Sequence, residues 1–276
     1  LGDVYKRQAK DDPVIRAHVR THTMSTFAPG TFSPRPQRVG VASMARVQGA
    51  IESKLMLRHG EQQLLSVIIP LAILIGAHKL EGMTGHGLEE IFSMVLAVAA
   101  TSSGFTGQAI SLAFDRRYGA LKRTGASGVP AWAIIVGKII AVLSMVVIQV
   151  LVLGTVAAIL GLRVGAEGIA VSIVALVLGV AAFTALGLLL GGTLSSEVVL
   201  AVSNLIWFIL LGTVGWVLYS QGLGDNGLVT LVPTVAMASG LNIALSGGFP
   251  GTELLVLAGW AALASFAAVR WFRFEG

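Results

Sequence analysis

AWAIIVGKIIAVLSMVVIQVLVLGTVAAIL, residues 131–160, contains a single charged side chain, Lys138. An apolar helix of this length exceeds the roughly 20 residues that cross a bilayer. Five further apolar runs flank it, at about 63–79, 91–113, 168–190, 199–219 and 253–271. We place the span that contains Lys138 at residues 132–160. Together the six runs predict an all-α integral membrane domain with six transmembrane helices over residues 61–276.

The composition of the chain excludes a soluble catalytic domain in this apolar part. Apolar residues make up 55% of the 276, and residues 129–276 hold nine charged side chains against 24 in residues 1–128. The net charge is +5, but most basic residues lie in the N-terminal tail and one loop, where they act as orientation signals. We therefore expect no nucleic-acid partner. The chain has no cysteine, which excludes disulfides and thiol chemistry.

The first 40 residues are poor in apolar side chains and rich in Pro, Ser, Thr and Arg. Such a segment cannot bury enough surface to fold, so we predict a disordered tail over residues 1–40. Its opening, LGDVYKRQ at residues 1–8, resembles a translated sequencing adaptor, because one reverse translation of DVYKRQ matches a transposon end used in library preparation. We expect Met24 to be the true start and leave open whether residues 9–23 are translated.

Residues 41–60 combine an apolar stripe with basic positions. The stripe is formed at helical spacing by Val41, Met44, Val47, Ile51 and Leu55, and the basic residues are Arg46, Lys54 and Arg58. This pattern predicts an amphipathic helix that lies in the headgroup region and interacts with membrane lipids.

Lys and Arg near the span ends predict the orientation. With both termini in the cytoplasm, the cytoplasmic side holds nine: Arg46, Lys54, Arg58, Arg116, Arg117, Lys122, Arg123, Arg270 and Arg273. The opposite side holds Lys79 and Arg163. The positive-inside rule therefore favours cytoplasmic N and C termini.

Two connections are longer than hairpins. The basic one, Asp115 to Pro130, reads DRRYGALKRTGASGVP and predicts a short helical piece between glycines. The other, Ser220 to Gly251, has two apolar stretches too short to cross a bilayer. We expect short helices that lie at, or dip into, the outer face.

Signatures of enzymes and of metal binding are missing. Gly137-Lys138 continues into Ile139 and lacks the upstream glycine of a P-loop, and no G-x-S-x-G occurs. His59, His78 and His86 have no ligand spacing for a metal. We expect no catalytic residue, no metal and no cofactor in this chain.

The polar side chains inside the spans are mostly neutral. They are Thr101, Ser102, Ser103, Thr106, Gln108, Gln149 and Asn204. Two interpretations stay open: hydrogen bonds between helices, or a substrate route along Thr101, Ser103, Gln108 and Asn204. Lys138, near the end of its span, is expected to snorkel to the headgroups, which weakens an ion-coupled mechanism. The Gly187 to Gly191 step favours ordinary helix packing.

The basic loop also fits a docking element for a soluble partner. With its surroundings it resembles the membrane subunits of type-2 ABC exporters, a permease family that includes actinobacterial drug and antibiotic efflux proteins. The matching features run in order over residues 41–276: the amphipathic helix, AFDRRYGALKRTGASGVPAWAIIVGKI after the second span, six spans, and LVPTVAMASGLNIALSGG before the last. The pattern Asp-Arg-Arg-x-Gly-x-Leu-Lys, followed by Gly, Pro and a Gly-Lys pair, is the most specific part.

The resemblance implies an elbow helix at 41–60 and a coupling helix within Asp115 to Ser127. It also implies a separately encoded ATPase that carries ATP and Mg, a second permease copy or paralogue, and a bacterial cytoplasmic membrane. On this basis we expect the ATPase-coupling residues to be Asp115, Arg116, Arg117, Tyr118, Leu121, Lys122 and Arg123. The basic members would dock an acidic ATPase surface, with Tyr118 and Leu121 as apolar anchors.

Two other functions stay open from the sequence. One is an ion-coupled or facilitative carrier, and the other is a membrane scaffold without transport. A hydrophobic drug, a lipid or a glycan precursor would each suit a neutral polar route, and a homodimer or heterodimer is equally compatible with the sequence.

Overall fold

The structure is a computed structural model that describes residues 40–58, 60–79, 85–126 and 128–272, with side chains between 60 and 65 excluded. Within these ranges every regular element is a helix, as predicted. The tail 1–39, the adaptor-like residues 1–8 and Met24 lie outside them. The described helices belong to the unit Gly40–Gly276.

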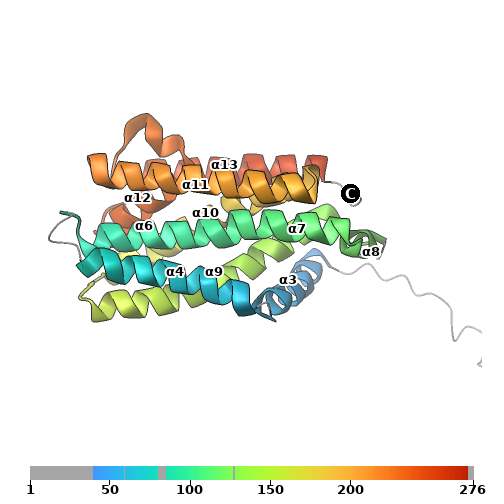
Figure 1. Ribbon diagram of the computed structural model, residues 1–276, viewed down its shortest axis with the longest axis horizontal. Helices are drawn as coiled ribbons and strands as arrows, with labels where there is room; N and C mark the ends of the chain where they lie inside the picture. The colour runs from blue at the N-terminus through green and yellow to red at the C-terminus, as the bar shows by residue number, and fades with distance from the viewer. Residues whose placement is uncertain (1–39, 59, 80–84, 127, 273–276) are drawn as a thin grey trace, which may run out of the picture. The chain divides into compact units, whose positions relative to one another are not determined.

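Long helices of alternating direction form the body of this unit (Figure 1). They are α4 (Gly60–Lys79), the continuous α6 (Leu88–Thr101), η1 (Ser102–Thr106) and α7 (Gly107–Arg117), then α9 (Ala131–Ile159), α10 (Ala166–Thr193), α11 (Ser196–Gln221) and α13 (Gly251–Trp271). Five of these segments are long and apolar enough to cross a membrane. In α4 the described apolar part, Ser66–Lys79, is shorter, so the sixth span remains a prediction.

Helix α10 lies at the centre and packs against α13, α7, α12 and α9. Its close approach to the second span depends on glycine, because a Cβ at Gly187 would meet the carbonyl oxygen of Phe105 and one at Gly191 that of Ala109. The predicted packing role of the Gly187 to Gly191 step is thereby confirmed. The exposed flanks of the bundle are apolar, as lipid requires: α11, for example, exposes Leu205, Phe208 and Ile209.

The second span contains a π-helical turn that hydropathy did not predict. Residues Ser102–Thr106 form η1, and the helix continues to Arg117 instead of ending near 113. A π-turn inserts one extra residue, which rotates the following helix relative to the preceding one. The residues from Gly107 onward therefore face other neighbours than a regular helix would give them.

The two ends of the bundle differ (Figure 1). One end carries α3 (Val41–Arg58), α8 (Ala120–Ala126) and the C-terminal end of α13. The other carries η2 (Gly227–Leu231) and α12 (Pro233–Leu245). Most of α12 is buried, against α10, α6, α13 and α11, so the prediction of a short helix in this connection is confirmed. That this end is the outer face of the membrane remains a prediction.

Helix α3 packs along the first half of α9. Gly49 lies against Ile140, and Gly137 lies against Gln48, so small residues on both helices permit the approach. The predicted stripe is on the opposite side, where Val47 and Ile51 are at least half exposed. The helix is therefore present at residues 41–58 but buries a partly polar face; its position in the headgroup region remains a prediction.

Candidate functional site

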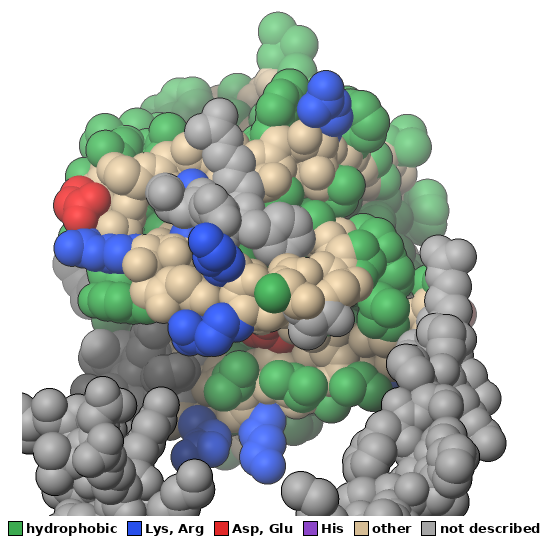
Figure 2. Space-filling view, turned by 90° about the vertical axis from the view of Figure 1, so that its right-hand side faces the viewer, with side chains coloured by type: hydrophobic (Ala, Val, Ile, Leu, Met, Phe, Trp, Pro, Cys, Tyr) green, Lys and Arg blue, Asp and Glu red, His purple; other side chains and the backbone are tan. Residues whose placement is uncertain are grey.

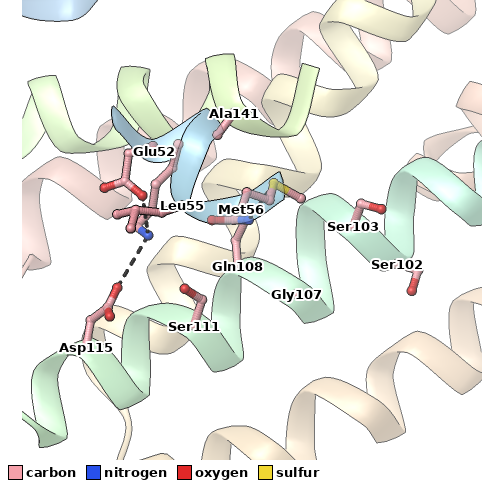
Figure 3. A pocket seen from close by; sticks show the side chains of 11 residues that line it. Glu52, Leu55, Met56, Ser102, Ser103, Gly107, Gln108, Ser111, Asp115 and Ala141 are labelled. Carbon is pink, nitrogen blue, oxygen red and sulfur yellow. Dashed lines mark hydrogen bonds and ion pairs between the residues drawn. The ribbon is translucent and has the colours of Figure 1, made fainter. Parts of the chain in front are cut away.

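A cavity of about 220 Å³ lies between α3, the η1–α7 segment and α9 (Figure 3). It belongs to the half of the bundle that carries α8. Its lining mixes polar and apolar side chains: Glu52, Leu55, Met56, Ser102, Ser103, Gly107, Gln108, Ser111, Asp115, Lys138 and Ala141. Three separate segments of the chain thus contribute polar groups to one space.

A cluster of three charges, centred on the buried Lys138, forms one wall of this cavity. Lys138 Nζ lies 3.1 Å from Glu52 Oε2 and 3.5 Å from Asp115 Oδ2, and only 4% of the lysine side chain is exposed. Gln48 Nε2 donates to the other Glu52 oxygen at 3.1 Å. The expectation that Lys138 snorkels to the headgroups was wrong, because two carboxylates neutralise it inside the bundle.

The charge cluster joins three helices beside the basic connection. Glu52 lies on α3, Lys138 on α9, and Asp115 on α7, two residues before that helix ends. After Arg117 the chain turns through Gly119, whose φ of 70° suits glycine, and enters α8. A displacement of α8 would therefore act directly on a helix end that carries one of the three charges.

Two of the four predicted route residues line the cavity. Ser103 and Gln108 do so, whereas the Thr101 hydroxyl donates to the Ala97 carbonyl at 2.7 Å within its own helix. Asn204 is exposed on α11 and donates to the Leu200 carbonyl at 2.8 Å. The structure therefore does not bring Thr101 and Asn204 to the cavity.

The π-turn is attached to neighbouring helices by a glutamine. Gln149 Nε2 of α9 donates to Ser103 Oγ at 3.0 Å and to the Ser66 carbonyl of α4 at 3.1 Å. For Gln149 and Ser103 the interpretation as hydrogen bonds between helices is confirmed. Ser103 is thus both an interhelical contact and part of the cavity wall.

Two of the residues expected to dock an ATPase point inward. Arg116 is buried, and its Nη1 donates to the carbonyls of Gly191 at 2.9 Å and Leu194 at 3.0 Å. These carbonyls belong to the C-terminal end of α10, which lacks intrahelical donors and attracts a cation. Leu121 is also buried, in a cluster with Leu112 and Ile134. Neither side chain is exposed to a partner in the described conformation, and their part in ATPase coupling stays a prediction.

Other residues of the basic connection are exposed. Tyr118 is 69% exposed and stacks on Phe114 with ring centroids 6.0 Å apart. Arg117 pairs with Glu197 and donates to Ser196 Oγ at 3.1 Å, at the start of α11. Lys122 and Arg123 are exposed on α8. Figure 2 shows this end, where Lys and Arg side chains gather and apolar side chains follow the flanks.

Apolar helices of membrane-spanning length, with a polar cavity among them, are the features of a multi-pass membrane protein. The sequence model of the ABC-2 type transporter membrane domain matches residues 49–223, so the chain belongs to the ABC-2 type transporter family. The match runs from α3 through α11 and includes the whole cavity lining. No curated protein matched the chain. A membrane domain of this family is the permease component and has no nucleotide-binding domain of its own.

Proposed function

We propose that this chain is the membrane subunit of an ATP-driven exporter and is coupled at its α8 end to a separately encoded ABC ATPase. The family implies such a partner in general. The observation that carries the coupling site is the short path from α8 through Gly119 and α7 to the ion pair between Asp115 and Lys138. ATP and Mg would be bound by the partner.

The proposed docking surface consists of Tyr118, Lys122 and Arg123. All three are exposed, and together they offer one aromatic anchor beside two cations for an acidic partner surface. A shallow cavity between α8 and α9, lined by Gly125, Ala126 and Val129 among others, adjoins them. Arg116 and Leu121 would support this surface from inside by holding α8 and the end of α10.

ATP binding by the partner would push α8 and shift α7 against α3 and α9. The charge cluster and the π-turn lie on that route, and either can adopt a second arrangement only by exchanging polar partners. The polar cavity would then open to a different side of the membrane.

We propose a pair of permease subunits in a bacterial cytoplasmic membrane, with the α8 end in the cytoplasm and Ser103 and Gln108 on the substrate route. Export of drug-like molecules is the proposed role.

The docking proposal is tested by co-purification of the affinity-tagged chain with an ATPase encoded beside its gene. Tyr118→Ala should lower the amount of bound ATPase at least several-fold, because an exposed aromatic anchor is lost. Phe249→Ala is the matched control, since Phe249 is 74% exposed near the opposite end of the bundle. Equal ATPase recovery with both variants would refute the docking surface.

A proton-coupled carrier is the second candidate, and one observation favours it. Lys138 is an ionisable group held inside the bundle, as such carriers require. Transport that stops when the proton gradient is collapsed but continues after ATP depletion would favour the carrier. The opposite pattern would support the exporter.

A further inference from the structure

A second cavity, of about 430 Å³, lies in the half of the bundle that carries α12, between α6, α9, α10 and α12. Its inner wall is apolar and includes Leu96, Leu176 and Leu241. Its rim includes Ile173, which is 54% exposed, so the cavity opens on the flank of the bundle. We call it the α9–α10 groove.

A glycine keeps the α9–α10 groove open. Gly154 of α9 lines it, and no heavy atom lies within 4 Å of the position that a Cβ would occupy there. This differs from Gly187 and Gly191, which face a neighbouring backbone closely. A side chain at position 154 would therefore enter open space.

Two polar groups stand out against this apolar lining. The Ser172 hydroxyl is buried in the groove, and the described part of the chain offers it no hydrogen-bond partner. Arg163, in the α9–α10 turn, lines the end of the groove and is exposed. Within residues 40–58, 60–79, 85–126 and 128–272 it forms neither an ion pair nor a hydrogen bond.

Two acidic side chains near Arg163, Glu89 and Glu90, have other partners. A neighbouring polar cavity contains Arg163, Glu89 and Glu90. Glu89 accepts from Ser246 Oγ at 3.1 Å, while Glu90 contacts His86 Nδ1 at 3.0 Å and accepts from the Leu223 amide at 3.3 Å. Among the described residues, neither carboxylate forms an ion pair with Arg163.

We propose that the α9–α10 groove binds an anionic glycerophospholipid from the leaflet on the α12 side. One acyl chain fills the groove, the phosphate lies at Arg163, and a glycerol ester carbonyl accepts from the Ser172 hydroxyl. The flank of a membrane bundle faces lipid, so an apolar slot there takes acyl chains rather than water. An interfacial arginine selects headgroups with net negative charge. This site does not depend on the proposed ATPase partner.

Native mass spectrometry of the full chain, delipidated in detergent, tests the assignment. The probes are dioleoylphosphatidylglycerol and dioleoylphosphatidylcholine. The unmodified chain should bind the anionic lipid about fivefold better than the zwitterionic one, and Arg163→Gln should abolish that preference. Lys79→Gln, which removes a cation from the same end, should keep it.

Gly154→Leu tests the groove itself. Leucine fills open space and improves helix propensity, so the fold is not at risk. Binding of both lipids should fall at least fivefold, whereas Gly259→Leu on α13, which also enters open space, should bind like the unmodified chain. No preference in the unmodified chain, a retained preference in Arg163→Gln, or undiminished binding in Gly154→Leu would each overturn the proposal.

Discussion

Replacement of Lys138 by methionine is the sharpest test of the charge cluster. Methionine keeps most of the side-chain volume but removes the cation, which leaves Glu52 facing Asp115 without it. The lysine side chain is 4% exposed, that of Glu52 16% and that of Asp115 41%. The pair with Glu52 should therefore dominate the energetics, and the more exposed Asp115 should contribute little.

The expected loss follows from these exposures. Breaking a fully buried pair costs about 3–5 kcal/mol, but Glu52 borders a cavity and keeps its bond from Gln48. We therefore expect Lys138→Met to lower the free energy of unfolding by about 2–3 kcal/mol. Asp115→Asn should cost about 1 kcal/mol or less.

The measurement is unfolding in mixed micelles of dodecyl maltoside and increasing dodecyl sulfate, followed by tryptophan fluorescence. The double variant Glu52→Gln, Lys138→Met should recover most of the loss, because the less exposed carboxylate is removed together with the cation and the Asp115 carboxylate that remains is 41% exposed. Arg123→Gln, an exposed cation at the same end, serves as the control and should stay within about 0.5 kcal/mol. Two results would show that these charges do not form a coupled pair. One is an unchanged free energy of unfolding in Lys138→Met, and the other is a double variant whose loss equals the sum of the losses in Lys138→Met and Glu52→Gln.

Three further predictions use the same unfolding assay. Gly191→Val should cost about 1–3 kcal/mol, because its side chain meets the Ala109 carbonyl; an unchanged stability would contradict the close α7–α10 packing. Gln149→Leu should cost about 0.6–1.7 kcal/mol through loss of the bond to Ser103, and a gain in stability would argue against that bond. Arg116→Gln should cost about 1–3 kcal/mol, because two carbonyls of α10 lose a charged donor; a cost no larger than that of an exposed arginine would place Arg116 outside the bundle.

Much of the fold was predictable from the sequence because hydropathy reports directly on burial in lipid. The last predicted span, 253–271, matches α13 at Gly251–Trp271, and the span at 168–190 lies within α10. The short helix α12 was predictable since its apolar stretch cannot cross a bilayer and proline suits its first turn.

The site was harder to predict because it depends on contacts between distant segments. Glu52 and Lys138 are 86 residues apart, and no local pattern pairs them. Arg116 and Arg117 are neighbours in sequence, yet one caps α10 from inside and the other pairs with Glu197 at the surface. Their difference is set by the rotation of α7 relative to α10, and the π-turn before α7 changes that rotation without any signal in hydropathy.

The most direct test asks which of the two proposed subunits hydrolyses ATP. The measurement is the rate of ATP hydrolysis by the purified chain alone and by its complex with the ATPase encoded beside its gene. The chain alone should hydrolyse no ATP, and the complex should hydrolyse it at a rate that falls when Tyr118→Ala weakens docking. Hydrolysis by the chain alone, or transport by the chain without any ATPase, would contradict the proposal that it is the permease subunit of an ATP-driven exporter.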